Sequence, residues 1–386
     1  MVVVRVPVAP ALLNWAVDRA RMDSAELQKR FPKFDEWERG AERPTLKQLE
    51  KFANATHAPL GFLFLQTPPL EVLPIPDYRT LGNVNISRPT PDLLDTIYIC
   101  QGRQDWYRQF ALARGFDPLP FVGSVAVGDP VEPTADEIRR TIGFTLPQRG
   151  GFQNGDDALR RLIDTIESVG ILVMVSGIVG GNTHRILNKD EFRGFALADR
   201  IAPLIFVNGS DTKAAQIFTL VHELVHIWVG ETALSDAAMA TDSANASEAW
   251  ANSVAAEILV PLASIRTAFG GTIDAGELRR LANRYRVSTL VILKRLFDAG
   301  FIAWADYQDQ YADELDRLMA IIARHRQGPG GGDFYNTQPL RVSQHFARAV
   351  IVDALEGGTL FRDAYGLVGT AKHETFMKLG EHLGVA

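Results

Sequence analysis

The stretch VHELVHIWVG, residues 221–230, places two histidines four positions apart, with a glutamate directly after the first. On a helix, side chains four residues apart share a face, so His222 and His226 can bind one metal ion. Glu223 lies beside them, where a carboxylate can act as general base on a water molecule. The alternative is a buried core helix in which both histidines are only hydrogen-bonded. The residue types and their spacing favour a catalytic zinc site.

A catalytic zinc site needs three protein ligands and one position open to water. The extended pattern that adds a third histidine is absent, because Val229 and Thr232 stand at its glycine and histidine positions. The downstream segment ASEAWANSVAAEILVP, residues 246–261, offers two carboxylates instead. At about 100° per residue, Glu248 and Glu257 lie on opposite sides of a helix. Only one of them can face the histidines.

Glu248 is the favoured third ligand because of its neighbour on the same helix face. Asn252 follows it by one turn, and an amide there can hydrogen-bond a ligating histidine or carboxylate as an outer-shell partner. Glu257 remains the alternative ligand. The sequence therefore predicts one zinc ion per chain, bound by His222, His226 and Glu248, with Asn252 behind the ligands.

Composition limits the class of protein. The chain has 386 residues, 46% of them hydrophobic, which predicts two or three compact domains. A net charge of −6 excludes binding to nucleic acid through bulk positive charge. A single cysteine, Cys100, excludes an intrachain disulfide and favours a reducing compartment. Pro7 and Pro10 interrupt the apolar N-terminus, and no apolar run approaches the ~20 residues of a membrane span. We expect a soluble, cytoplasmic protein with no membrane partner.

Turn residues and proline divide the chain into segments. Short helical patterns alternate with turns at the N-terminus, a proline-rich stretch follows, and GPGGG interrupts the C-terminal part. The predicted divisions are a helical bundle at 1–66, a connector at 67–89, the domain of the histidine motif at 90–327 with its core at 150–265, a flexible hinge at 328–332, and a helical appendix at 333–386. A flexible hinge suggests that the appendix partly covers the zinc cleft or a substrate groove, as a lid that a partner displaces.

The core of the central domain mixes strands and helices. Short β-branched or aromatic runs, separated by Gly, Asn and Asp, predict three strands before the histidine helix. That helix is expected to begin near Asp211 and to end at Gly230. A polar loop through Asn245 and a second helix at about 246–259 follow. The predicted fold class is α+β, mainly helical, with a small three-stranded sheet.

Two runs in this core resemble a known family. GFALADRIAPLIFVNGSDTKAAQIFTLVHELVHIWVG and SEAWANSVAAEILVP resemble the ImmA/IrrE family of bacterial zinc metallopeptidases over about residues 150–265. The resemblance implies a thermolysin-like zincin core in which His222, His226 and Glu248 bind zinc and Glu223 is the catalytic base. Because members of that family cleave repressors, it also implies an endopeptidase that acts on a transcriptional repressor or an antitoxin-like protein.

The N-terminal bundle resembles a second family. WERGAERPTLKQLEKFANATHAPLGFLF is similar to the last helices of Xre-type helix-turn-helix domains. The expected recognition helix carries Asp35, Glu36 and Glu38, whose charges would repel phosphates. This argues against DNA binding by residues 1–66 and favours a protein partner, such as a toxin, or regulation of the peptidase.

Two other classes of function stay open. One is a helix-turn-helix transcriptional regulator, or the antitoxin of a toxin–antitoxin pair, whose zinc domain senses or docks without turnover. The other is a zinc-stabilised interaction protein. The intact Glu223 and the scarcity of basic residues on the recognition helix favour the enzyme.

Overall fold

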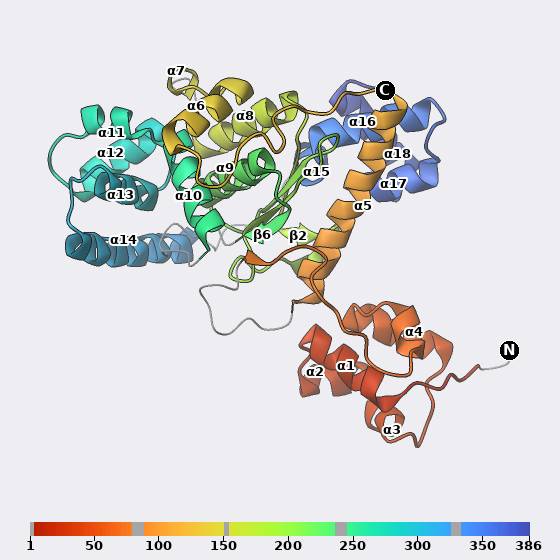
Figure 1. The fold of residues 1–386 in the computed structure, drawn as a ribbon. Coiled ribbons are helices and arrows are strands. Elements are labelled where there is room, and N and C mark those ends of the chain that lie inside the picture. Colours follow the sequence, from red (N-terminus) through yellow and green to blue (C-terminus); the bar gives the residue numbers. More distant parts are fainter. Residues whose placement is uncertain (1–3, 79–88, 150–153, 236–244, 326–332) are drawn as a thin grey trace. The chain divides into compact units, whose positions relative to one another are not determined.

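A computed structural model describes residues 4–78, 89–149, 154–235, 245–325 and 333–386 (Figure 1). The predicted hinge at 328–332 and part of the predicted connector at 67–89 lie outside the described residues. Two compact units make up the chain. The first comprises Met1–Pro74 and Ser87–Ile97, and the second comprises Ile75–Ile86 and Tyr98–Ala386.

The first unit is a bundle of short helices. Its helices are α1 (Pro10–Ala20), α2 (Ser24–Arg30), α3 (Phe34–Glu38), α4 (Leu46–Thr56) and the 3-10 helix η1 (Leu60–Phe64). The expected cap of α4 is present. The Thr45 hydroxyl accepts a hydrogen bond from the Gln48 backbone amide, and the Gln48 side chain accepts one from the Thr45 backbone amide. Phe31 and Phe52 belong to the core of this unit and pack edge to face, with ring centroids 5.3 Å apart.

The second unit contains all the strands of the described residues. They are β1 (Leu172–Ser176), β2 (Ile178–Val179), β3 (Asn182–Ile186), β4 (Gly194–Leu197), β5 (Leu204–Asn208) and β6 (Ala233–Ser235). Its helices are α6 (Val131–Ile142), α7 (Leu146–Arg149), α8 (Gly155–Ser168), α9 (Lys213–Val229), α10 (Ala246–Leu259), α11 (Leu262–Ala268), α12 (Ala275–Tyr285), α13 (Thr289–Asp298), α14 (Trp304–His325), α15 (Phe334–Val342), α16 (Gln344–Leu355), α17 (Phe361–Val368) and α18 (His373–Leu383). Helix α5 (Pro91–Ala113) contributes residues to both units.

Four strands form the main sheet, in the order β1-β5-β4-β6. β1 and β5 are parallel, whereas β4 runs antiparallel to both β5 and β6. The three expected strands correspond to β1, β4 and β5, and the expectation of a three-stranded sheet was wrong by one strand. β6 is only three residues long and lies where a loop was expected, since its pairing comes from tertiary contacts rather than from a local pattern. A separate hairpin joins β2 and β3.

The sheet separates helices on its two faces (Figure 1). Val173 of β1 and Ile205 of β5 face the large core that they share with α8, α9 and α10. The next residue of β1, Met174, points the other way and contacts Cys100 of α5, as strand alternation requires. Gln104 of α5 donates hydrogen bonds to two backbone carbonyls near the ends of β4 and β5. This layering holds α9 firmly against the sheet.

The C-terminal helices pack at the β1 end of the sheet. Ser343 donates a hydrogen bond to Glu167 of α8, and the Tyr107 hydroxyl of α5 lies 2.8 Å from His345 Nε2. Arg103 of α5 donates to the carbonyl of Leu367. β1 and β6 are the two opposite edges of the sheet, so these described contacts do not place the appendix over the histidine motif. The structure gives no support to the expected lid.

No helix in the described parts of the chain combines the length and the apolar character that crossing a bilayer requires.

Candidate metal centre

Helix α9 carries the histidine motif through the middle of the second unit. Thr212 caps its first turn, one residue beyond the expected Asp211, by accepting a hydrogen bond from the Ala215 backbone. Gly230 ends it as expected, with φ at +80°, a conformation that glycine adopts without strain. Every residue from Gln216 to Trp228 is buried. Polar side chains in the middle of α9 therefore need partners inside the protein.

Helix α10 supplies the carboxylate of the site. Asn245 caps its start, and Glu248 lies in its first turn, packed toward α9 with 2% of its side chain exposed. At the other end, Glu257 forms a buried ion pair with Arg295. The carbonyls of that end accept hydrogen bonds from three buried arginines, Arg139, Arg149 and Arg295. Glu257 is thus engaged in holding α10 in place, and Glu248 is the carboxylate that faces the histidines.

Three side chains converge on one point. His222 Nε2 and His226 Nε2 are 3.1 Å apart, Glu248 Oε2 lies 3.1 Å from His222 Nε2, and Glu248 Oε1 lies 3.2 Å from His226 Nε2. Ligands bound tetrahedrally to zinc at 2.0–2.1 Å are separated from one another by about 3.3 Å. The observed separations are close to that value.

The carboxylate oxygens of Glu248 are buried and have no hydrogen-bond donor in the described residues. Buried polar atoms are rarely left without a partner, and a divalent cation would satisfy all three groups at once. Two imidazoles and one carboxylate are also a donor set that suits zinc. His222, His226 and Glu248 therefore fit a metal ion.

Burial and charge shape the ionisation of the carboxylates. Burial opposes ionisation of Glu248, but the close ring nitrogens of His222 and His226 and their positive charge outweigh it and lower the pKa to about 2. Burial raises the pKa of Glu223 to about 8, and the negative charge of Glu248 adds to this rise. Glu223 accepts one hydrogen bond, from the Ser235 hydroxyl at 3.3 Å, and its other carboxylate oxygen has no partner in the described residues. With this pKa the group is mostly protonated at neutral pH, and the positive charge of a metal ion on the three ligands would favour the carboxylate form that a general base needs.

Glu231, which was not predicted from the sequence, lies beside the ligand His226. Glu231 Oε2 lies 3.6 Å from His226 Nδ1 and accepts a hydrogen bond from the Ser247 hydroxyl. At 3.6 Å this is an ion-pair contact and not a hydrogen bond, so Glu231 acts on His226 through its negative charge. No helical spacing relates Glu231 to His226, because the chain reverses at Gly230 before it.

The predicted outer-shell residue Asn252 lies one turn after Glu248 on α10. Its Oδ1 atom is buried without a partner in the described residues, and no described contact joins it to a ligand. Its role remains a prediction.

Comparison with known families identifies the segment that contains these residues. Residues 166–297 match the model of peptidase family M78, described as the IrrE N-terminal-like domain. Residues 166–297 are therefore similar to an IrrE N-terminal-like domain. This match indicates a peptidase-type hydrolase domain, and it overlaps the segment where the sequence resembles the ImmA/IrrE family. Residues 342–382 match a second family, a domain of unknown function (DUF8813). No curated protein and no solved structure matches the chain.

The IrrE N-terminal-like domain brings β4 unusually close to α9 at Gly194. A Cβ atom there would lie 2.6 Å from Thr219 Cγ2, 2.9 Å from the Phe206 carbonyl oxygen and 3.2 Å from Glu223 Cγ. Gly194 also pairs with Ser235 across β4 and β6, so both residues stand over Glu223. Only glycine allows this approach, and the sequence alone gave no sign of it.

We expect Gly194→Ala to lower the free energy of unfolding by about 1–3 kcal/mol, because the added methyl group overpacks the contact between β4 and α9. Urea denaturation followed by circular dichroism measures this loss. Gly102→Ala in α5 is the matched control, since nothing lies within 4 Å of its Cβ position. That control is expected to leave stability unchanged or slightly raised. Equal stability of the Gly194→Ala protein and the wild type would contradict the proposed close contact.

A tyrosine from the proline-rich connector also reaches the IrrE N-terminal-like domain. The ring centroids of Tyr78 and His226 are 6.3 Å apart. Burial raises the pKa of Tyr78, and the negative charges of Glu231 and Glu248 raise it further. This residue is distant in sequence from the histidine motif, so no local pattern could have identified it.

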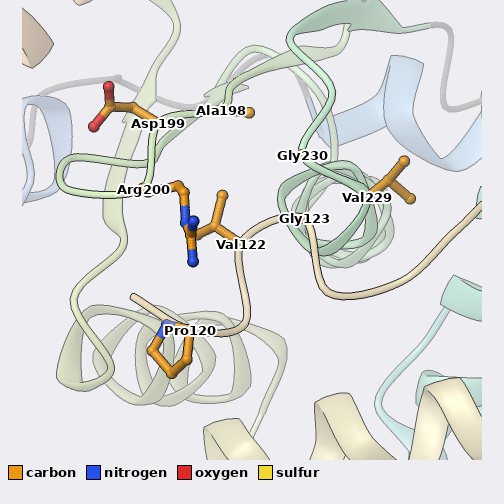
Figure 2. A pocket seen from close by; sticks show the side chains of 8 residues that line it. All are labelled: Pro120, Val122, Gly123, Ala198, Asp199, Arg200, Val229 and Gly230. Atoms are coloured by element: carbon orange, nitrogen blue, oxygen red, sulfur yellow. The ribbon is translucent and has the colours of Figure 1, made fainter. Parts of the chain in front are cut away.

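One open cavity of about 370 Å³ lies apart from these residues (Figure 2). Its lining comes from the segment before α6, from the residues after β4 and from the end of α9, namely Pro120, Val122, Gly123, Ala198, Asp199, Arg200, Val229 and Gly230. Asp199 is already engaged, because it forms an ion pair with Arg108 and accepts hydrogen bonds from two backbone amides. None of the converging ligands lines this cavity, and we do not assign it to the metal centre.

Proposed function

We propose that the chain is a zinc-dependent endopeptidase that cleaves a regulatory protein, such as a transcriptional repressor or an antitoxin. The observation that carries this proposal is the convergence of His222, His226 and Glu248 beside the buried Glu223. The match to a peptidase family supports hydrolysis rather than a purely structural zinc site. The resemblance to the ImmA/IrrE family supports a regulatory protein as the substrate, a zincin core and one zinc ion per chain.

In the proposed hydrolysis of a peptide bond, the residues of the site have different roles. A zinc ion held by the three ligands supplies a Lewis acid. Glu223 accepts a proton from the attacking water while the water oxygen bonds to the scissile carbonyl carbon. Glu223 then passes this proton to the amine nitrogen as the carbon–nitrogen bond breaks. The negative charge of Glu231 favours the ring orientation in which His226 Nδ1 faces it. Because Glu223 is fully buried, bulk water does not compete for its carboxylate.

The N-terminal bundle is proposed to bind a protein partner or to regulate the peptidase. Asp35 and Glu36 of α3 are exposed, so the helix that would face a DNA groove presents two carboxylates to solvent. A toxin or the substrate itself is the kind of partner that this surface suits. Catalysis and partner binding would then reside in different units of one cytoplasmic protein.

We expect weak or undetectable sequence-specific DNA binding by the full-length chain. The carboxylates on α3 repel phosphates, and the whole chain is negatively charged. A gel-shift titration with the upstream region of its own gene at about 150 mM salt measures the affinity. Nanomolar binding would show that another surface of the bundle contacts DNA and that the interpretation of α3 is wrong.

The substrate can be sought with a variant that binds without turning over. Full-length Glu223→Gln protein, loaded with zinc and immobilised, should retain a specific protein from a lysate of the source cells. The Glu223→Gln/Glu248→Gln double variant is the control, because it keeps the bundle but lacks a complete metal site. The captured protein is then incubated with zinc-loaded wild type and with wild type stripped by a chelator. Cleavage only in the zinc-loaded reaction supports the proposal, and a captured protein that stays intact contradicts it.

A further inference from the structure

Residues 75–78 extend the sheet beyond its last strand. β6 ends the strand order, so one of its edges is free for another segment. The Leu234 backbone amide donates a hydrogen bond of 2.9 Å to the Pro76 carbonyl, and Asp77 forms a parallel bridge with Leu234. Ile75, just before them, is buried with 6% of its surface exposed. The end of the proline-rich connector is thus fixed to the edge of the catalytic sheet.

Two residues that follow this pairing reach α9. The bridge ends at Asp77, and Tyr78 and Ser235 are the residues that follow its two partners along the chain. The Ser235 hydroxyl reaches Glu223. The Tyr78 ring contacts the His226 ring. Gly194, Ser235 and Tyr78, a row of residues from three chain segments, thus each lie close to a side chain in the middle of α9.

Tyr78 adds to this row a phenolic hydroxyl on a ring beside His226. Apart from each other, the ligand histidines contact two aromatic rings in the described residues, those of Phe218 and Tyr78. Phe218 belongs to α9 and has no polar atom, whereas Tyr78 carries a hydroxyl near the charges of Glu231 and Glu248. Attack of water on a peptide carbonyl develops negative charge on its oxygen, and a fixed hydrogen-bond donor stabilises that charge.

We propose that Tyr78 is a catalytic residue whose hydroxyl donates a hydrogen bond to the carbonyl oxygen of the peptide under attack. This inference rests on the proposed function and adds to it a residue outside the segment that matches the peptidase family. The neutral hydroxyl acts only as a donor, so no proton leaves it during the reaction. The pairing of Pro76 and Asp77 with β6 holds the ring in position.

The test uses a small tetrahedral anion in place of the unidentified substrate. Full-length protein is loaded with Co²⁺, and dimethylphosphinate is titrated while the visible absorption of the cobalt is recorded. Tyr78→Phe keeps the ring that faces His226 and removes only the hydroxyl. Loss of a hydrogen bond to a charged group is expected to weaken dimethylphosphinate binding roughly 10- to 100-fold. Tyr98→Phe, in which an exposed tyrosine of α5 is changed, is expected to match the wild type.

Cobalt binding and dimethylphosphinate binding together show whether the role of Tyr78 or the metal site itself is wrong. Cobalt affinity and the cobalt spectrum without dimethylphosphinate should be the same in wild type and Tyr78→Phe; a change in either would make Tyr78 a metal ligand and overturn the proposal. Equal dimethylphosphinate affinity in both proteins, or cobalt-loaded wild type that does not bind it, would also overturn the proposal while leaving the metal site intact. A wild-type protein that binds no cobalt would instead refute the proposed function, and the role of Tyr78 with it.

Discussion

Glu223→Gln is expected to lower the rate of substrate cleavage roughly 10³-fold while zinc stays at one ion per chain. The amide fits the space of the carboxylate but cannot accept the proton of the attacking water. Glu223 does not belong to the converging ligand set, so its replacement leaves His222, His226 and Glu248 in place. Steady-state cleavage of the captured substrate and metal analysis of the same preparation provide the two measurements.

Glu132→Gln, on the exposed side of α6, is the matched control and should cleave at the wild-type rate. A Glu223→Gln protein that retains most of its activity would show that another group takes the proton. A variant that loses its zinc would show instead that Glu223 takes part in metal binding.

The second large effect distinguishes the two glutamates of α10. Glu248→Gln is expected to weaken zinc binding by more than about 100-fold, the upper loss typical of an outer-shell partner, because it removes a charged ligand. Glu257→Gln is expected to keep one zinc ion but to lower the free energy of unfolding by about 3 kcal/mol, since the buried Arg295 then loses one of its two carboxylate partners and keeps only Asp298.

Zinc competition titration and urea denaturation on both variants measure this contrast. The pair is well matched, because the same chemical change is made at both ends of one helix. If Glu257→Gln loses zinc and Glu248→Gln keeps it, the direction in which the structure places the two side chains is wrong.

The sequence predicted the parts of the site that depend on local periodicity. His222 and His226 lie on one face of α9, and the opposite directions of Glu248 and Glu257 follow from 100° per residue on α10. The sequence also predicted the end of α9 at Gly230 and the cap of α4 at Thr45, because capping depends on residues within one helical turn.

The parts that depend on contacts between distant segments were not predicted. β6 is too short to have a pattern, and its place in the sheet comes from pairing with β4. Glu231 reaches His226 only because the chain turns back at Gly230. Tyr78 is more than one hundred residues from the motif and reaches it through a backbone hydrogen bond, which no side-chain pattern encodes. The docking of the appendix at β1 likewise depends on single contacts such as Ser343 with Glu167.

Anomalous diffraction at the zinc absorption edge, from crystals of the zinc-loaded full-length chain, tests the central claim most directly. We expect one strong peak at about 2.0–2.2 Å from His222 Nε2, His226 Nε2 and a carboxylate oxygen of Glu248. A zinc-loaded crystal with no peak between these three side chains, or with its peak on other residues, would contradict the proposed metal centre and the peptidase mechanism built on it.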